Sequence, residues 1–397
     1  MQLHKEVQLA YRQLAMGMLT LFVVIALGRF AYTPIMPYMQ AATHLEDKGA
    51  GLLATFNYLG YLIGAILPTF FIIRSKVFDL KLYLFLNVIT MFLLGMTTNY
   101  GLWCALRLLN GIASGVGFVL ASNVVLEALR RARKEAISGL LYSAVGAGIF
   151  FSSIFVFFYT DTNNWGMTWK ILGVFAFALA LIVLIFLKDM PTEQVEKGHV
   201  STQPRRRYSK IYYLSYYLAY FSEGAGYIIT GTFLVALIKA IPQLEPYAPL
   251  SWMFVGLGAI PSTVLWSMIG EKIGNGRATQ MCFIIQVIAV LTPVVTSNVI
   301  ALIVSSMLFG CTFLGLTTLF MSRGQKMAYE TGNSHIVSLM TFIYSVGQMI
   351  APYIAGIILA KTAGYTFALI FASVILVLGL MSHMYSEKHV HLEKKFL

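Results

Sequence analysis

Three charged side chains lie deep inside long apolar stretches of the sequence: Arg29, Arg107 and Glu223. An ionised group is costly in a hydrocarbon layer, so charges found there usually face a protein-lined pathway and carry function. A carboxyl group can take up and release a proton, whereas a guanidinium stays charged and offers several N–H donors. These residues therefore indicate recognition of a charged solute, proton transfer, or both.

Other polar residues share helical faces with these charges. Residues three or four positions apart lie on one side of a helix, and this spacing places Tyr220, Glu223 and Tyr227 in one stripe. The residues expected along a central substrate or proton pathway are Arg29, Tyr32, Thr33, Asn57, Tyr61, Arg107, Asn110, Ser114, Tyr220, Glu223, Tyr227, Tyr344 and Gln348.

The depth of two of these charges suggests an interaction between them. With a rise of about 1.5 Å per residue, Glu223 lies roughly 18 Å and Arg29 roughly 14 Å into their helices. Our hypothesis is that Arg29 and Glu223 pair in one conformation and separate in another, or when Glu223 is protonated. For Arg107, a role in the pathway and a role in bracing a helix end both stay open.

The elements that hold these residues are apolar segments long enough to cross a membrane. Of the 397 residues, 58% are hydrophobic and 11% are charged, and one span takes roughly 20 residues. Continuous apolar runs without period-two alternation favour helices over a β-barrel. The spans are expected at 14–39, 50–73, 79–98, 101–126, 136–160, 168–187, 211–239, 250–269, 278–296, 299–321, 335–360 and 363–384.

The polar stretch 189–210 divides the chain into two halves of six spans each. We therefore predict an all-α membrane protein of twelve transmembrane helices, with a first bundle at 1–188, a linker loop at 189–210 and a second bundle at 211–397. Residues 108–111 (LLNG) resemble residues 307–310 (MLFG), with Ser306 in the place of Arg107. This match indicates an internal repeat of the kind found in many transporters.

Small residues spaced by four predict close helix packing. They form the pairs Gly60 with Gly64 and Gly111 with Gly115. Trp252 and Trp266, near the ends of the eighth span, are expected to anchor that span at the membrane interface.

The net charge of +12 reflects topology. Clusters such as residues 130–134 and 205–210 fall on one side of the predicted membrane, so both termini are expected in the cytoplasm. This distribution argues against a nucleic-acid partner and for a multi-pass membrane protein. The isolated Cys104, Cys282 and Cys311 predict no disulfide and no metal site, and no cofactor is expected.

Two motifs resemble the major facilitator superfamily (MFS) of transporters. One is residues 107–115 (RLLNGIASG); the other is the loop that contains Gly270, Glu271, Lys272, Gly274 and Arg277. Within the superfamily, residues 28–37 and 226–234 look like the uncharacterised bacterial YbfB/YjiJ-type branch. The resemblance implies a central cavity lined by helices one, four, seven and ten, a coupling or gating role for Arg107, and a cytoplasmic gating role for the loop. It also implies a place in the bacterial cytoplasmic membrane.

Two departures from the superfamily pattern leave the direction of transport open. Residues 74–81 (RSKVFDLK) have the charges but not the glycines of the gating loop, and the fifth span has no Gly-Pro pair of the kind associated with proton-driven efflux.

The predicted function is secondary active transport of a small organic solute, coupled to protons. Two arginines against one glutamate favour an anion or a compound with a carboxylate. No GxxxxGK[ST] loop is present to bind ATP. The alternatives are proton-exchanging efflux of amphipathic drugs or metabolites and, less favoured, a non-transporting receptor.

An enzyme is not expected, because the chain has no HExxH or GxSxG motif and no histidine predicted at mid-span. A monomer in the lipid bilayer is the expected functional unit, since twelve spans suffice to form a pathway.

Overall fold

The computed structural model describes residues 2–189, 208–333, 335–362 and 364–390, and the predicted linker 189–210 lies almost entirely outside them. The described residues contain helices and no β-strand. The helices are α1 (Gln2–Leu21), η1 (Phe22–Phe30), α2 (Tyr32–Thr43), α3 (Asp47–Phe70), α4 (Lys76–Leu94), α5 (Tyr100–Arg131), η2 (Glu135–Ile137), α6 (Leu140–Tyr159), α7 (Trp165–Phe186), α8 (Lys210–Lys239), η3 (Glu245–Tyr247), α9 (Ala248–Ile273), α10 (Asn275–Val295), α11 (Val299–Thr331), α12 (His335–Thr362) and α13 (Tyr365–Val390).

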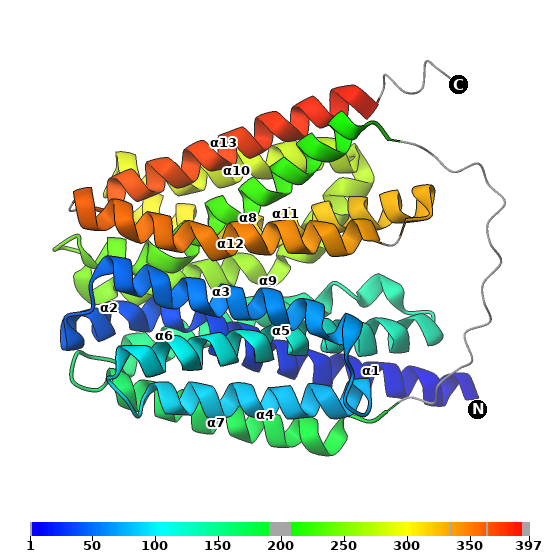
Figure 1. Ribbon diagram of the computed structural model, residues 1–397, viewed down its shortest axis with the longest axis horizontal. Helices are drawn as coiled ribbons and strands as arrows, with labels where there is room; N and C mark the ends of the chain where they lie inside the picture. The colour runs from blue at the N-terminus through cyan, green and yellow to red at the C-terminus, as the bar shows by residue number, and fades with distance from the viewer. Residues whose placement is uncertain (1, 190–207, 334, 363, 391–397) are drawn as a thin grey trace.

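Within the described part of the chain, 12 helical segments are long and apolar enough to cross a membrane. Helices α1 to α7 form one layer and α8 to α13 the other, and α1 begins at the same end of the molecule at which α13 ends (Figure 1). We call this end the termini side and the opposite end the far side. The predicted fold class, twelve helices in two bundles, is confirmed.

The first span contains a change of helix type that the sequence analysis did not predict. Residues Phe22–Phe30 form a π-helix between α1 and α2. Pro34 has no N–H to give to the carbonyl four residues earlier, and the next bond, from the Ile35 N–H to the Ala31 carbonyl, is long at 3.4 Å. Arg29 lies at the end of this segment. Because π segments widen a helix and are frequent at functional sites, this position marks Arg29 as a candidate functional residue.

The glycine pairs pack α3 directly against α5. A Cβ atom on Gly60 would collide with the Leu108 carbonyl, and one on Gly111 would collide with the Asn57 carbonyl. Only glycine permits such close backbone approach. The packing role predicted for these residues is confirmed.

The second bundle repeats this contact between α9 and α11. A Cβ atom on Gly258 would collide with the Met307 carbonyl, and one on Gly310 would collide with the Val255 carbonyl. In the first bundle, the carbonyl that Gly111 approaches belongs to Asn57, one turn before Gly60. In the second bundle, the carbonyl that Gly310 approaches belongs to Val255, one turn before Gly258. The repeat predicted from the sequence is therefore present in the packing.

The two bundles pack against each other through α3 with α12, through α6 with α9, and along the far half of the first span. Helix α2 packs against α8 and α9, whereas α1 packs against α5, α6 and α7 of its own bundle. The Thr33 hydroxyl donates a 2.5 Å hydrogen bond to the Gly231 carbonyl, and the Thr55 hydroxyl donates a 2.8 Å bond to the Met349 carbonyl. These bonds link the first span to α8 and α3 to α12.

The prediction that Trp252 and Trp266 are interfacial anchors is wrong. Their exposed fractions are 1% and 2%. The Trp252 ring contacts Phe30 of the other bundle with centroids 6.1 Å apart, and the Trp266 indole N–H donates to the Cys311 carbonyl at 2.8 Å. The two side chains are buried because they fill interhelical space.

Candidate functional site

The Arg29 guanidinium is enclosed by aromatic rings. Arg29 is only 5% exposed, and its Cζ atom lies 4.3 Å from the Tyr61 ring centroid, 4.5 Å from that of Tyr58 and 5.2 Å from that of Phe30. Aromatic faces attract such a cation. Its Nε and Nη2 atoms have no hydrogen-bond partner among the described residues. The charge is thus held in place while two donor atoms stay available.

The second bundle presents a stack of aromatic rings next to this guanidinium. Phe30, which lies beside the guanidinium, contacts the Phe313 ring of α11 at 6.1 Å. The ring of Tyr227 in α8 stacks on Phe313 at 5.5 Å and on Tyr344 at 6.0 Å. The Tyr344 ring also stacks on Tyr220, at 4.6 Å, and the Gln348 amide donates to the Tyr227 hydroxyl. The predicted residues of α8 and α12 therefore meet beside Arg29.

Arg107 holds helices of the first bundle together. It is 1% exposed, and its Nε and Nη1 atoms each donate a long 3.4 Å bond, to the carbonyls of Leu53 and Gly28 respectively. The Tyr32 ring lies 4.4 Å from its Cζ atom, and Nη2 has no partner in the described ranges. These contacts suit the bracing role that the sequence analysis left open.

Asn57, Asn110 and Ser114 lie in a hydrogen-bond network inside the first bundle. The Asn57 amide donates to the Asn110 side-chain oxygen at 3.2 Å, and the Ser114 hydroxyl donates to the Val24 carbonyl at 2.7 Å. Asn87 of α4 completes the network by donating to the Ser114 hydroxyl at 3.0 Å. Sequence analysis missed Asn87, although an asparagine at the middle of an apolar span was a usable signal.

Glu223 lies in the core of the second bundle, away from a cationic partner. It is fully buried, and Gln286 of α10 is a close neighbour of its carboxyl group. Neither carboxyl oxygen has a hydrogen-bond partner among the described residues. Arg29 and Glu223 form no ion pair in this conformation. Sequence analysis did not identify Gln286 either, although a glutamine at the middle of an apolar span is the same kind of signal.

His383 is a further buried polar residue that the sequence analysis overlooked. Its ring lies 5.9 Å from that of Tyr216 and 5.8 Å from that of Phe320, and it is 0% exposed. The last span was predicted to end at residue 384, whereas α13 continues to Val390. The histidine consequently lies well inside a helix instead of at its end.

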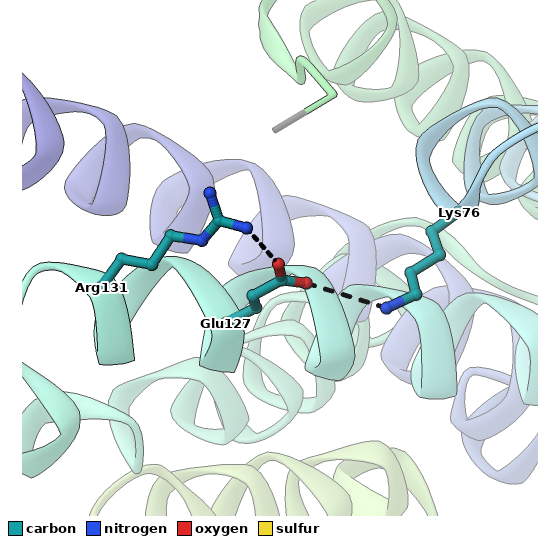
Figure 2. A network of polar contacts seen from close by, with 3 residues as sticks. All are labelled: Lys76, Glu127 and Arg131. Carbon is teal, nitrogen blue, oxygen red and sulfur yellow. Dashed lines mark hydrogen bonds and ion pairs between the residues drawn. The ribbon is translucent and has the colours of Figure 1, made fainter. Parts of the chain in front are cut away.

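The residues of the predicted gating loop form a tight helix-to-helix turn on the termini side. Gly270, Glu271 and Lys272 belong to the last turn of α9, and Arg277 belongs to the first turn of α10. Gly274 between them has φ 90°, a backbone conformation that glycine adopts readily. In the first bundle, Glu127 contacts Arg131 at 2.6 Å and Lys76 at 3.7 Å on the same side (Figure 2).

Two solved structures resemble the whole chain. A point mutant of the nucleoside transporter NupG matches with a TM-score of 0.73 and 12% identity, over 94% of this chain and 99% of that one. A bacterial homologue of the human lysosomal transporter Spinster, solved in an inward-facing and unoccupied conformation, matches with a TM-score of 0.72 and 12% identity, over 97% of this chain and 98% of that one.

At such identities the two structures establish the fold alone. No curated protein matches the chain in sequence. The family model described as "Uncharacterised MFS-type transporter YbfB" matches residues 21–383. The chain therefore belongs to this family of MFS transporters.

Proposed function

We propose that the protein is a secondary active transporter of small organic anions that carry a carboxylate, and that protons drive it. The observation that supports this substrate class is the Arg29 guanidinium, buried between the bundles with two donor atoms unpartnered. A guanidinium binds a carboxylate through two parallel hydrogen bonds. The rings of Tyr58, Tyr61 and Tyr227 would exclude water from such a contact and strengthen it.

The charge balance of the buried residues favours the same class of substrate. Arg29 and Arg107 carry two positive charges, and neither forms an ion pair in the described part of the chain. A bound carboxylate compensates one of these charges. Glu223 is the residue we assign to the driving proton, because it is a buried carboxyl group of the second bundle and has no cation beside it among the described residues.

Transport would proceed by alternating access between the halves 1–188 and 211–397, connected by the linker 189–210. The packing of α2 on α8 and of α1 on its own bundle supports a conformation closed on the far side. The clustered basic residues on the termini side support its assignment to the cytoplasm. We further propose that the protein works as a monomer in the bacterial cytoplasmic membrane.

Uptake into proteoliposomes tests the proposed substrate class. With an imposed proton gradient, we expect accumulation of radiolabelled benzoate, and a loss of at least about tenfold in Arg29→Gln, because one charged hydrogen-bonding group contributes roughly 1.5–3 kcal/mol. The matched control is Arg130→Gln, which changes an exposed arginine on the termini side and should leave uptake unchanged. Failure to transport any of a panel of carboxylates would contradict the proposal.

The aromatic stack favours one second candidate, proton-exchanging efflux of amphipathic compounds. Tyr220, Tyr227 and Tyr344 offer flat aromatic surface that binds apolar and cationic groups. Proton-driven transport of tetraphenylphosphonium, with no response to carboxylates, would replace the first proposal by this one. Arg29→Gln should then leave transport intact.

A further inference from the structure

The core of the second bundle contains a carboxyl group and an amide that lack other partners. Glu223 of α8 and Gln286 of α10 are both 0% exposed. Both carboxyl oxygens of Glu223 and both polar atoms of the Gln286 amide have no hydrogen-bond partner among the described residues. The two side chains are nevertheless close neighbours.

The titratable groups that face Glu223 come from three helices. They are Tyr220 and Tyr227 of α8, Cys282 of α10 and Tyr344 of α12. Within the described ranges, none of these neighbours is a cation. An ionised carboxylate here would have no counter-charge, and burial of such a charge costs several kcal/mol or more.

We propose that Glu223 and Gln286 together form a proton-binding site that is separate from the Arg29 anion site. In this conformation Glu223 is a neutral carboxylic acid, and its O–H donates to the side-chain oxygen of Gln286. When the proton leaves, the amide turns about its last torsion and its N–H donates to the carboxylate. Gln286 is thus a positioning residue that serves both states of Glu223.

This arrangement changes how proton and substrate are coupled. A direct Arg29–Glu223 ion pair would make the proton and the substrate compete at one contact. Here the two sites are connected through α8, which carries Glu223 toward α10 and, one turn later, Tyr227 toward Arg29. Protonation would then act on the position of α8. This role in coupling rests on the proposed function, whereas the presence of the proton does not.

The difference between the infrared spectra of the wild type and of Glu223→Gln tests the site without any transport assay. Both are measured on the purified full chain in lipid nanodiscs. At neutral pH, the wild type should show the C=O band of a protonated carboxylic acid, and this band should be missing in Glu223→Gln. Gln286→Leu should move the band to the frequency of an acid without a hydrogen bond. A wild-type spectrum without the acid band would overturn the proposal, whatever the Gln286 variant does.

Transport measurements then test the role of the amide. In Gln286→Leu the carboxylate form of Glu223 loses its donor, so proton release is harder and the pH profile of uptake should move to alkaline pH by about one unit. Gln286→Asn keeps an amide, so its pH profile should lie between those of Gln286→Leu and the wild type. The control Gln13→Leu removes another fully buried glutamine, which donates to the Lys188 carbonyl at 2.6 Å, and should leave the profile in place.

The two experiments separate the inference from the proposed function. If the acid band is absent while carboxylate uptake persists, the proton site is wrong and the transport function stands. If the band is present and no carboxylate is transported, the proton site stands and the substrate class is wrong. A pH profile that does not move in Gln286→Leu would remove the assigned role of Gln286.

Discussion

The two bundles share a backbone contact but fill it with different side chains. In both, a pair of glycines lets a helix approach the carbonyls of its neighbour, α3 with α5 and α9 with α11. The positions around this contact are polar in the first bundle and mostly apolar in the second. The matched residues are Asn57 and Val255, Arg107 and Ser306, Asn110 and Phe309, and Ser114 and Phe313.

This difference shows that the repeat preserves packing and not chemistry. Hydrogen bonds of the Asn57 and Asn110 amides tie the helices of the first bundle. Phe313 instead offers its ring to Tyr227 and Phe309. The first bundle therefore supplies a rigid frame for two buried cations, whereas the second supplies an aromatic surface and the proton-binding carboxyl group that we propose.

The shared contact should be the most sensitive feature of both bundles. Gly111→Ala and Gly310→Ala each place a methyl group against a backbone carbonyl, and each should lower the free energy of unfolding by about 3 kcal/mol. Thermal unfolding in detergent micelles measures this effect. Gly364→Ala, where an added Cβ atom meets nothing within 4 Å, is the control. An effect in one bundle only would break the equivalence.

Replacing Arg107 by serine, the residue at the matched position Ser306 of the second bundle, should have the next largest effect on stability. Arg107→Ser leaves the carbonyls of Leu53 and Gly28 without their donor and opens a cavity, so we expect a loss of about 2–3 kcal/mol. Ser306→Ala should change stability by less than about 0.5 kcal/mol. Chemical unfolding in mixed micelles compares the two. Equal losses would show that Arg107 does not brace the bundle.

The asparagine network of the first bundle should contribute more to stability than the Phe309 ring, which takes the place of Asn110 in the second bundle. Asn110→Leu removes the side-chain oxygen that accepts from the Asn57 amide and the amide that donates to the Asn87 carbonyl and the Thr90 hydroxyl, and it should cost about 2 kcal/mol. Phe309→Leu shortens a packed side chain and should cost about 1 kcal/mol. The same unfolding measurements decide the order, and a reversed order would contradict the distinction between a polar and an aromatic bundle.

Substitutions at the helix ends on the termini side should change stability least in both bundles. In the second bundle, the Asn275 amide donates to the Leu319 carbonyl at 2.9 Å, and Asn275→Ala should cost about 1 kcal/mol. In the first bundle, Lys76 lies 3.7 Å from Glu127 with half of its side chain exposed (Figure 2), so Lys76→Ala should cost less than about 0.5 kcal/mol. Added salt should abolish the Lys76 effect alone; a salt-sensitive Asn275 effect would contradict this assignment.

Sequence analysis identified features that depend on the residues of one helix. The twelve spans follow from the apolar length of each segment, and the Gly60 and Gly111 contacts follow from spacing on one face. Asn87 and Gln286 could have been noticed as polar residues at mid-span, but their partners on α5 and α8 could not be predicted. The neighbours of His383 on α8 and α11 were equally unpredictable, because they belong to other helices.

The surroundings of Arg29 were only partly predictable from the sequence. Its depth in the membrane was predictable, and so was its place at the junction of the bundles. The π segment that carries it was not, because that segment depends on how Pro34 and the neighbouring helices accommodate the broken hydrogen-bond ladder. The cage of Tyr58 and Tyr61 from α3 likewise depends on the rotation of one helix against another.

The amino-acid sequence by itself determined that this chain crosses a membrane repeatedly, that its halves repeat, and that three charges are buried, because hydrophobicity, helical period and residue type are local properties. The tertiary structure decided which groups these charges meet: tyrosine rings for Arg29, backbone carbonyls for Arg107 and an amide for Glu223. Those partners are set by the packing and rotation of whole helices, and many distant residues share control of that packing.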